Sequence, residues 1–360
     1  MIKILHAADF HLGARFRSLP PEQAARRRQQ QRSVLADLCR LRQDLDCRLV
    51  LLAGDLLDRP QGCREEARVL AEILEAMEAP VFVAPGNHDY LTADSPYLQI
   101  AWPKNVHIFT QPELTSVCLP ELDCRVWGAG FSSMDCPGLL EGFRAPGEEP
   151  LQLMVLHADP VNPASPCCPV TRAQVEASGL AYLALGHIHT KGTLRAGHTL
   201  CAWPGCPMGR GFDETGVKGV YLAEVSPGHA EATFVPSAAG RYMDLSVPAG
   251  PDPLRAVSAR LPAGTEQDVY RITLTGEAPP VNCEALRRAL EGRFFSLQLQ
   301  DRTMPPRNLW EQAGEDSLEG RYFQLLQEAA ERAEGAEQEA LCLAARISRQ
   351  ILDGQEVTLP

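Results

Sequence analysis

The chain has 360 residues, of which 45% are hydrophobic and 22% charged, a composition typical of a globular protein. No apolar run approaches the roughly 18 residues that a membrane-spanning helix needs, which argues against a membrane protein. The formal net charge of −12 argues against nonspecific nucleic-acid binding by the chain as a whole. Such binding depends on Lys and Arg side chains that neutralise phosphates.

The charge is unevenly distributed along the sequence. Residues 1–50 contain ten Lys or Arg and five Asp or Glu, a net charge of +5, which leaves −17 for the remainder. A basic end on an acidic chain is a local indication of an anionic partner. The N-terminal apolar stretch is too short for a signal peptide, and the twelve cysteines include no C-x-x-C pair. We therefore expect a cytoplasmic protein with reduced cysteines.

The first half of the chain alternates short apolar runs with helical stretches. This βαβαβ rhythm predicts parallel strands joined by right-handed crossovers, and hence an α/β fold. The expected strands are Ile2–Ala7, Arg48–Ala53, Pro80–Ala84, Val106–Thr110, Arg125–Ala129, Leu151–His157 and Tyr182–Gly186, with helices at Gln23–Leu45 and Arg64–Met77.

The second half changes character twice. From Thr193 to Val235 the pattern is strand and turn, which indicates a sheet pair that closes the domain. The Pro- and Gly-rich segment Val247–Pro253 is typical of a linker. The elements expected beyond it are strands at Val269–Thr275 and Phe294–Gln300, a helix at Glu284–Glu291, and apolar stripes at helical spacing over Leu318–Ala329 and Leu341–Leu352.

Five short polar motifs each follow a predicted strand. Because the carboxyl ends of the strands in an open α/β sheet form its binding crevice, we expect these motifs to converge on one rim. In chain order they are Asp9-Phe10-His11, Gly54-Asp55-Leu56-Leu57-Asp58, Gly86-Asn87-His88-Asp89, His157 and Gly186-His187-Ile188-His189.

The side chains of these motifs are ligands of divalent cations. Carboxylates, imidazoles and an amide oxygen suit ions such as Mn²⁺, Fe²⁺ or Zn²⁺. A D-x-H or H-x-H pair in an extended segment points both side chains to one face, because strand side chains repeat every two residues. The two carboxylate oxygens of Asp55 are placed to bridge two ions. A pair of ions about 3.5–4 Å apart holds a hydroxide and clamps a phosphoryl group, so the set predicts a two-metal phosphoesterase.

The order D-x-H, G-D-x-x-D, G-N-H-D, H, G-H-x-H resembles the signature of the calcineurin-like metallophosphoesterases. The opening I-L-H-A-A-D-F-H-L-G, from Ile4 to Gly13, most resembles the bacterial DNA-repair exonucleases of the SbcD and YhaO-like branch. The turn Pro204–Glu214 also resembles that branch, with Cys206 where a serine is expected. The resemblance covers about residues 1–235 and is looser beyond.

The resemblance implies an α/β fold, with a metallophosphoesterase β-sandwich flanked by helices in four layers, α/β/β/α. A small α+β appendage and C-terminal helices would follow. We accordingly expect a calcineurin-like metallophosphoesterase domain at residues 1–240, a small α+β capping-like domain at 241–306 and a C-terminal helical segment at 307–360.

The resemblance also implies two metal sites. The ions would most readily be Mn²⁺, with Fe²⁺, Zn²⁺ or Mg²⁺ as alternatives. One ion would be bound by Asp9, His11, Asp55 and His189, and the other by Asp55, Asn87, His157 and His187.

Two further residues have implied catalytic roles. His88 would face the substrate without binding metal, and would stabilise the transition state or protonate the leaving oxygen. Asp58 would hold the His88 imidazole and favour its protonated form. Asp89 is expected to be a turn or capping residue.

The predicted function is that of a two-metal-dependent DNA exonuclease or phosphodiesterase in DNA repair or processing, which uses a metal-bridging hydroxide. An Arg-rich segment leaves the metal rim and is a candidate track for a phosphate backbone, or alternatively a solvated helix face. No base-reading motif is visible, so little sequence specificity is expected. The candidate DNA contacts are Arg15, Arg17, Arg26 and Arg27.

Partners are a further expectation from the resemblance. Nucleases of this branch work with an SMC-like ATPase subunit, and the apolar stripes of the C-terminal helices suit binding in a partner's groove. The same stripes can instead pack on their own domain. A homodimer is also compatible with the resemblance.

Two rival functions remain open at this point. One is a phosphatase or phosphodiesterase that acts on a small molecule or a phosphoprotein. The other is a non-catalytic scaffold with the same fold. Scaffolds of this kind usually lose metal ligands, whereas all seven candidate ligands and His88 are present in this sequence.

Overall fold

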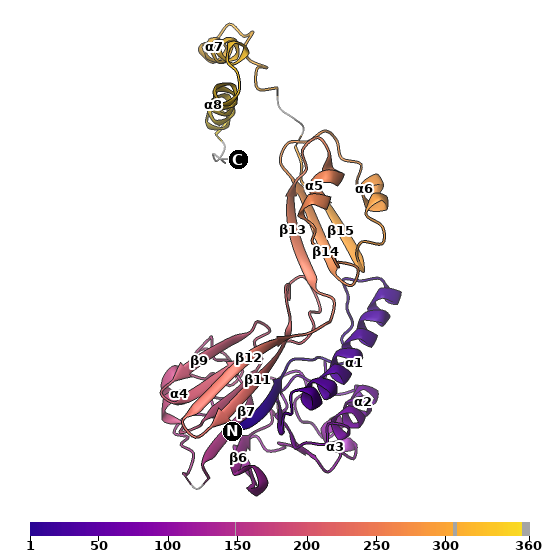
Figure 1. The fold of residues 1–360 in the computed structure, drawn as a ribbon, viewed down its shortest axis with the longest axis vertical. Helices are drawn as coiled ribbons and strands as arrows, with labels where there is room; N and C mark the ends of the chain where they lie inside the picture. Colours follow the sequence, from indigo (N-terminus) through magenta and orange to yellow (C-terminus); the bar gives the residue numbers. More distant parts are fainter. Residues whose placement is uncertain (148, 305–307, 355–360) are drawn as a thin grey trace. The chain divides into compact units, whose positions relative to one another are not determined.

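The structure is a computed structural model that describes residues 1–147, 149–304 and 308–354. The helices and strands are labelled in Figure 1. The chain forms two compact units. The first comprises residues 1–245, 262–272 and 290–299, and the second comprises 246–261, 273–289 and the described part of 300–360. The expected three-domain division stays a prediction, and its boundary at residue 306 lies outside the described residues.

A six-stranded sheet forms one half of the first unit's core. Strands β1 to β4 are parallel neighbours, and β11 and β12 extend the sheet antiparallel beside β1. Helices α1 (Pro21–Asp44) and α2 (Arg64–Glu75) lie in the crossovers that parallel strands require. In spatial order the strands are β12 (His229–Pro236), β11 (Gly219–Ser226), β1 (Ile2–Ala7), β2 (Leu49–Leu52), β3 (Val81–Val83) and β4 (Val106–Ile108).

A second six-stranded sheet forms the other half. Its four central strands are parallel, and an antiparallel strand lies at each edge. In spatial order they are β5 (Thr115–Leu119), β6 (Cys124–Gly128), β7 (Leu151–His157), β8 (Tyr182–Gly186), β10 (Thr199–Trp203) and β9 (Gly192–Ala196). The strand β5 was not expected from the sequence, because its side chains are half-buried or exposed and form no apolar run.

The two sheets face each other across an apolar core. Side chains alternate between the faces of a strand, so a strand covered on both sides is apolar throughout. In β2, Leu49 and Leu51 enter the core between the sheets, whereas Val50 and Leu52 pack in the cluster that contains the helices. All four are fully buried, and burial of a side chain of this size stabilises the fold by about 1.5–3 kcal/mol.

Helices cover the outer face of each sheet. α1 and α2 contribute Leu35, Leu38 and Leu70 to the cluster on the outer face of the first sheet. The short helix α4 (Arg172–Ala177) buries Val175 on the outer face of the second sheet. The layer order is therefore α/β/β/α, and the predicted fold class is confirmed. Two single-turn elements, α3 (Pro96–Gln99) and η1 (Pro120–Leu122), complete this part.

A three-stranded sheet follows in the chain, in the order β13-β14-β15. The expected linker at Val247–Pro253 is wrong, because Val247 is buried within β13 and Pro253 begins α5. The Asp252 carboxylate caps this helix by accepting a hydrogen bond from the Arg255 N–H at 3.0 Å. The elements are β13 (Tyr242–Pro248), α5 (Pro253–Arg260), β14 (Val269–Thr275), α6 (Cys283–Ala289) and β15 (Ser296–Asp301).

The described C-terminal residues form two helices, as expected from the apolar spacing, and the helices pair as a hairpin. Helices α7 (Leu318–Arg332) and α8 (Ala336–Leu352) pack on each other. The hydroxyl oxygens of Tyr322 and Ser348 lie 2.7 Å apart across the pair. Among the described residues, no helix is both long and apolar enough to cross a bilayer.

A buried histidine joins the two sheets. His6 of β1 is fully buried, with Nδ1 2.8 Å from the Tyr182 hydroxyl and Nε2 3.1 Å from the Leu185 carbonyl oxygen of β8. Burial lowers the pKa of His6 from 6.5 to about 3, against the opposing effect of the Leu185 carbonyl. The imidazole is therefore neutral in the folded protein.

This histidine predicts a pH dependence of stability. Below pH 6.5 the unfolded chain binds a proton at His6 that the folded chain excludes, so the free energy of unfolding falls as the pH drops towards 3. Between pH 6.5 and 5 the loss is roughly 2 kcal/mol, at about 1.4 kcal/mol per pKa unit. Urea unfolding of His6→Gln should show a shallower decline over this range than the wild type. The exposed His198→Gln control should follow the wild type, and equal slopes for all three proteins would contradict the assignment.

Candidate metal centre

The seven candidate metal ligands come from the carboxyl ends of five strands. Asp9 and His11 follow β1, Asp55 follows β2 and Asn87 follows β3, all in the first sheet. The other three belong to the second sheet, where His157 is the last residue of β7 and His187 and His189 follow β8. The strand ends of the two sheets meet, and the structure brings all seven side chains together.

The loops that carry these residues adopt an unusual backbone. Asp9, His11, Asp55 and His187 have positive φ angles of 55°, 48°, 50° and 85°. A non-glycine residue in this left-handed region costs about 1 kcal/mol or more, and such residues cluster at functional sites. The expectation that Asp9 and His11 share a face of an extended segment is therefore wrong. Left-handed turns bring the two side chains together instead.

Asp9, His11 and His189 form the first group of donors. One candidate ligand atom from each lies within 4.8 Å of the other two, and the Nε2 atoms of His11 and His189 are 3.3 Å apart. Asp9 Oδ2 is buried and has no hydrogen-bond partner. A buried acceptor without a partner is costly, and a bound cation at this position removes the cost.

Asn87, His157 and His187 form the second group. The Asn87 side-chain oxygen lies 2.8 Å from His157 Nε2 and 3.3 Å from His187 Nδ1. His157 Nδ1 lies 3.0 Å from the Ala53 carbonyl oxygen. A carbonyl accepts only, so Nδ1 carries a proton, and Nε2 is the ring nitrogen that can offer a lone pair to a metal.

Asp55 lies between the two groups. Its Oδ2 is 3.7 Å from His11 Nε2 and 3.4 Å from His157 Nε2, and its Oδ1 accepts a hydrogen bond from the His88 backbone N–H at 2.8 Å. Burial, together with the negative charges of Asp89 and Asp9, raises the pKa of Asp55 well above its usual range. Divalent cations beside this carboxylate would offset that repulsion. The donor set therefore fits two cations with Asp55 shared between them.

The pKa values of the histidines suit metal binding. Burial, and then the positive charge of Arg210, lower the pKa of His11 well below 6.5. Burial and the neighbouring His157 lower the pKa of His187 to about 4. Both imidazoles are therefore neutral near pH 7, the form in which histidine donates a lone pair to a metal.

Glu214 lies beside the candidate ligands and was not expected there from the sequence. Its Oε1 lies 2.7 Å from His189 Nδ1, which leaves His189 Nε2 to face His11. Burial lowers the pKa of His189, but the Glu214 hydrogen bond and Asp9 outweigh it and raise the pKa overall. Glu214 also accepts from Arg210 Nη2 at 2.6 Å. The one available signal was its place at the end of the turn noted at Pro204–Glu214.

Asp159 lies beside His187 of the second group, as Glu214 lies beside His189 of the first. Its Oδ2 lies 3.7 Å from His187 Nε2, on the side of the ring away from Asn87. Its Oδ1 accepts hydrogen bonds from the backbone N–H groups of Val161 and Asn162 at 2.8 and 2.9 Å. Carboxylates of this kind orient ligand imidazoles and raise their basicity.

Asp89 holds two of the metal loops together. It is fully buried and accepts hydrogen bonds from the backbone N–H groups of Asp55, Leu56, Leu57 and Gly86 and from the Tyr97 hydroxyl. Every one of these partners is a donor, so the carboxylate has no free face for a metal. The expected turn or capping role is confirmed.

His88 and Asp58 lie at the edge of the candidate centre. The His88 side chain is exposed, and its ring centroid is 4.7 Å from that of His11. Candidate ligand atoms of His11, Asp58 and His88 lie within 4.8 Å of one another. The nearest cation to Asp58 is Arg210, whose Nη1 is 3.7 Å from Asp58 Oδ1. Burial raises the pKa of Asp58, against the opposing charges of Arg210 and His88.

The four arginines proposed as DNA contacts differ in exposure. Arg15, Arg17 and Arg26 are exposed. Arg27 is fully buried, and its guanidinium donates to the carbonyl oxygens of Gly240 and Gly209 at 3.0 and 3.1 Å. A side chain held in this way cannot reach a phosphate backbone. The expectation for Arg27 is therefore corrected: it is a packing residue of α1.

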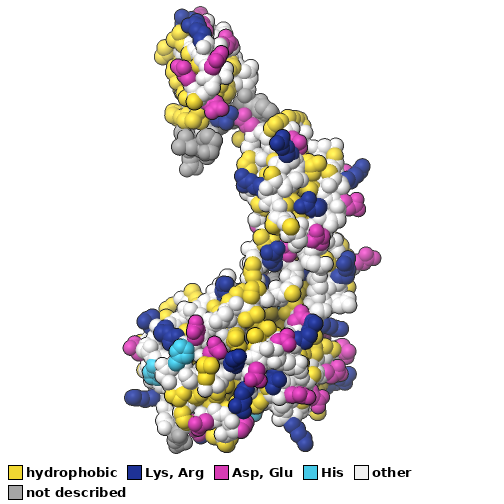
Figure 2. All heavy atoms as spheres, in the orientation of Figure 1, with side chains coloured by type: hydrophobic (Ala, Val, Ile, Leu, Met, Phe, Trp, Pro, Cys, Tyr) yellow, Lys and Arg dark blue, Asp and Glu magenta, His cyan; other side chains and the backbone are white. Residues whose placement is uncertain are grey.

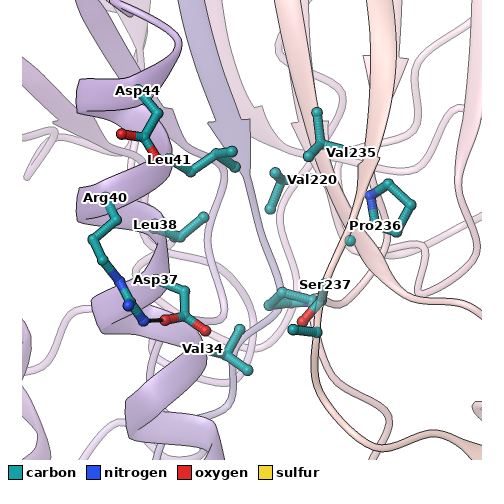
Figure 3. A pocket seen from close by; sticks show the side chains of 13 residues that line it. Val34, Asp37, Leu38, Arg40, Leu41, Asp44, Val220, Val235, Pro236 and Ser237 are labelled. Atoms are coloured by element: carbon teal, nitrogen blue, oxygen red, sulfur yellow. Dashed lines mark hydrogen bonds and ion pairs between the residues drawn. The ribbon is translucent and has the colours of Figure 1, made fainter. Parts of the chain in front are cut away.

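Two grooves on the first unit differ in their relation to this centre. A groove of about 480 Å³ contains Asp58, His88 and Arg210 and therefore opens beside the metal candidates. Another groove, of about 330 Å³, lies between α1 and the strands β11 and β12. Figure 3 shows Leu38 and Leu41 facing Val220 and Val235 across it. It contains none of the metal candidates, so the first groove is the candidate active site.

Comparison with known proteins places this geometry in a family. Residues 2–191 match the family model described as Calcineurin-like phosphoesterase, and the chain belongs to this family. Phosphoesterases of this family use divalent metals, in agreement with the groups of candidate ligands. The compartment of the protein stays a prediction.

Two bacterial relatives agree with the branch that the motifs indicated. The chain is 30% identical over 247 residues to "Uncharacterized metallophosphoesterase YhaO" of Bacillus subtilis, with 65% of this chain and 60% of that protein covered. It is 25% identical over 275 residues to the SbcD component of the SbcCD nuclease of the same species, with 65% and 68% covered. The suspected resemblance is confirmed. A solved dimetal phosphatase from Danio rerio is 11% identical, with 66% of this chain and 99% of that chain covered and a TM-score of 0.40.

Glu214 provides a test of the metal centre. Glu214→Gln keeps the side chain's size but removes the charge that orients His189, and loss of such a partner typically weakens metal binding 10- to 100-fold. Titration calorimetry with Mn²⁺ should show this loss. The exposed Glu141→Gln control should bind as the wild type does. Unchanged Mn²⁺ affinity in Glu214→Gln would contradict the role of Glu214.

Proposed function

We propose that this protein is a two-metal-dependent DNA phosphodiesterase with exonuclease activity in DNA repair or processing. The observation that carries the proposal is the position of Asp55 Oδ2, 3.7 Å from His11 Nε2 and 3.4 Å from His157 Nε2. A carboxylate shared by two groups of donors is the arrangement that a pair of divalent ions requires.

We propose the division of the ligands between two ions that the sequence suggested. Mn²⁺ is the first choice, with Fe²⁺, Zn²⁺ or Mg²⁺ as alternatives. When bound, the pair supplies Lewis-acid activation of the phosphoryl group and a nucleophile at neutral pH. One ion would be held by Asp9, His11, Asp55 and His189, and the other by Asp55, Asn87, His157 and His187.

His88 is the residue proposed to protonate the leaving oxygen. Its backbone N–H donates to Asp55, which places the residue beside the centre, while its side chain is exposed to the groove. The carboxylate of Asp58 lies within 4.8 Å of a His88 ring nitrogen and is the residue proposed to orient this imidazole. A positioned proton donor typically contributes 10²- to 10⁴-fold to the rate.

DNA is the substrate class that two observations support. One relative is named as part of a nuclease. In addition, Arg15 and Arg17 are exposed in the groove that contains His88. The second candidate is a phosphatase or phosphodiesterase for a smaller substrate, which the more general name of the YhaO relative leaves open. A scaffold without activity is disfavoured because every candidate ligand lies at the centre.

An assay of linear single- and double-stranded DNA with Mn²⁺ tests the proposal. The wild type should cleave DNA. His88→Ala should bind Mn²⁺ normally but lose about 10²- to 10⁴-fold of turnover, because it lacks the proton donor. Asp55→Ala should lose both Mn²⁺ binding and activity, because both groups of donors share this carboxylate. Calorimetry on the same preparations separates the two effects.

Two outcomes would contradict the proposal. Equal cleavage by the wild type and both variants would show that the activity comes from a contaminant. Turnover of 4-nitrophenyl phosphate without any cleavage of DNA would favour the smaller substrate. That result would support the metal centre and contradict DNA as the substrate.

The C-terminal hairpin is proposed to bind an SMC-like ATPase subunit. Phe323, Ala330 and Ala345 are buried, but α7 and α8 also expose apolar side chains. Figure 2 shows hydrophobic side chains at the surface of this hairpin. Apolar side chains that the hairpin leaves exposed are suited to binding in the groove of a partner protein. The exposed residues are Leu318, Tyr322, Leu325, Ile351 and Leu352.

A double substitution tests this partner. Leu318→Glu with Leu325→Glu places charges on the exposed apolar side, so co-purification with the ATPase subunit should be lost, while the isolated variant should still cleave DNA. A matched change of the exposed charged residues Glu319→Gln and Arg321→Gln should preserve the complex. Retention of the complex by the double Glu variant would exclude this surface.

A further inference from the structure

The groove beside His88 collects arginines from three separate segments. Arg15 and Arg17 lie in the loop after β1, Arg59 follows the second motif after β2, and Arg210 lies in the turn after β10. The groove measures about 480 Å³. Arg59 and Arg210 were not among the arginines that the sequence singled out as DNA contacts.

The acidic residues of this groove do not neutralise all of the arginines. They are Asp58, Asp213 and Glu214. Glu214 and Asp58 pair with Arg210, at 2.6 and 3.7 Å. Over the part of the chain that the structure describes, Arg15, Arg17 and Arg59 take part in no ion pair.

Arg210 is held in place by Glu214, while its Nη1 makes an ion pair with Asp58 but no hydrogen bond among the described residues. Glu214 accepts hydrogen bonds from Nε at 3.1 Å and from Nη2 at 2.6 Å. Nη1 faces Asp58 at 3.7 Å, which is beyond hydrogen-bond distance. A guanidinium that is held rigidly in this way binds an anion without further loss of side-chain freedom.

We propose that this groove is a subsite for a second phosphodiester of the strand being cut. Arg210 lies at the end of this subsite that is beside His88 and Asp58. The unpaired positive charge comes from Arg15, Arg17 and Arg59. The inference rests on the proposed function and narrows it to polynucleotide strands. A phosphomonoester or an isolated diester cannot occupy the metal centre and the arginines at once.

Arg59 is the best residue for the test, because its side chain is exposed and, among the described residues, no hydrogen bond or ion pair joins it to a metal candidate. Arg210 is unsuitable, since its loss would also release Glu214 from its place beside His189. The experiment compares Arg59→Ala with Arg172→Ala, an exposed arginine of α4 that lies outside the groove. The two substrates are hexathymidylate and bis(4-nitrophenyl) phosphate, which has a single phosphodiester, each with Mn²⁺.

The measured quantity is kcat/KM for hexathymidylate divided by kcat/KM for bis(4-nitrophenyl) phosphate. Arg59→Ala should lower this ratio about tenfold, because the variant loses a charged hydrogen bond to the second phosphate. Arg172→Ala should leave the ratio at the wild-type value. In metal-free protein, the slope of log affinity for hexathymidylate against log salt should decrease by about 0.7 in Arg59→Ala. Equal unfolding midpoints verify that both variants are folded.

The possible failures are distinguishable. If Arg59→Ala changed neither the ratio of kcat/KM for the two substrates nor the salt slope, the subsite proposal would be wrong. Turnover of DNA by the wild type would in that case still support the proposed function. Absence of turnover of both substrates by the wild type would overturn the proposed function. The salt slope in metal-free protein would then still decide whether the groove binds phosphodiesters.

Discussion

The buried carboxylate of Asp55 imposes the strongest constraint on this structure. It lies close to two other buried acids, Asp9 and Asp89, and their negative charges add to the cost of its removal from water. Burial keeps the His11 imidazole near its Oδ2 neutral, so this ring does not supply the missing positive charge. A proton or metal cations would compensate the charge of Asp55. The lone pairs of the surrounding histidines favour cations.

A second layer of residues keeps the donors in place around this carboxylate. Asp89 fixes the loops after β2 and β3, and Gln31 of α1 donates to the Phe10 and His11 carbonyl oxygens at 2.6 and 3.1 Å. Glu214 orients His189. These contacts also stabilise the left-handed residues of the metal loops, whose backbone cost has to be offset by the surrounding structure. The position of each donor thus depends on partners from distant parts of the chain.

The sequence predicted the strands and the meeting of the motifs, because each candidate ligand follows an apolar run and parallel strands end at one edge. It could not reveal the partners of the ligands: Glu214 lies in a turn 25 residues beyond His189, and nothing local marks Asp159 as a neighbour of His187. Arg27 was misassigned because it belongs to an Arg-rich run. Its spacing from Ala24, Gln31 and Val34 is that of the buried helix face, a signal that outweighs composition.

Diffraction from crystals grown in Mn²⁺ tests the central claim most directly. Anomalous scattering should show two manganese peaks for each chain, both within bonding distance of the Asp55 carboxylate. One peak should contact His11 and His189, and the other Asn87, His157 and His187. An ordered structure without peaks at this position, with the seven side chains apart, would contradict the account.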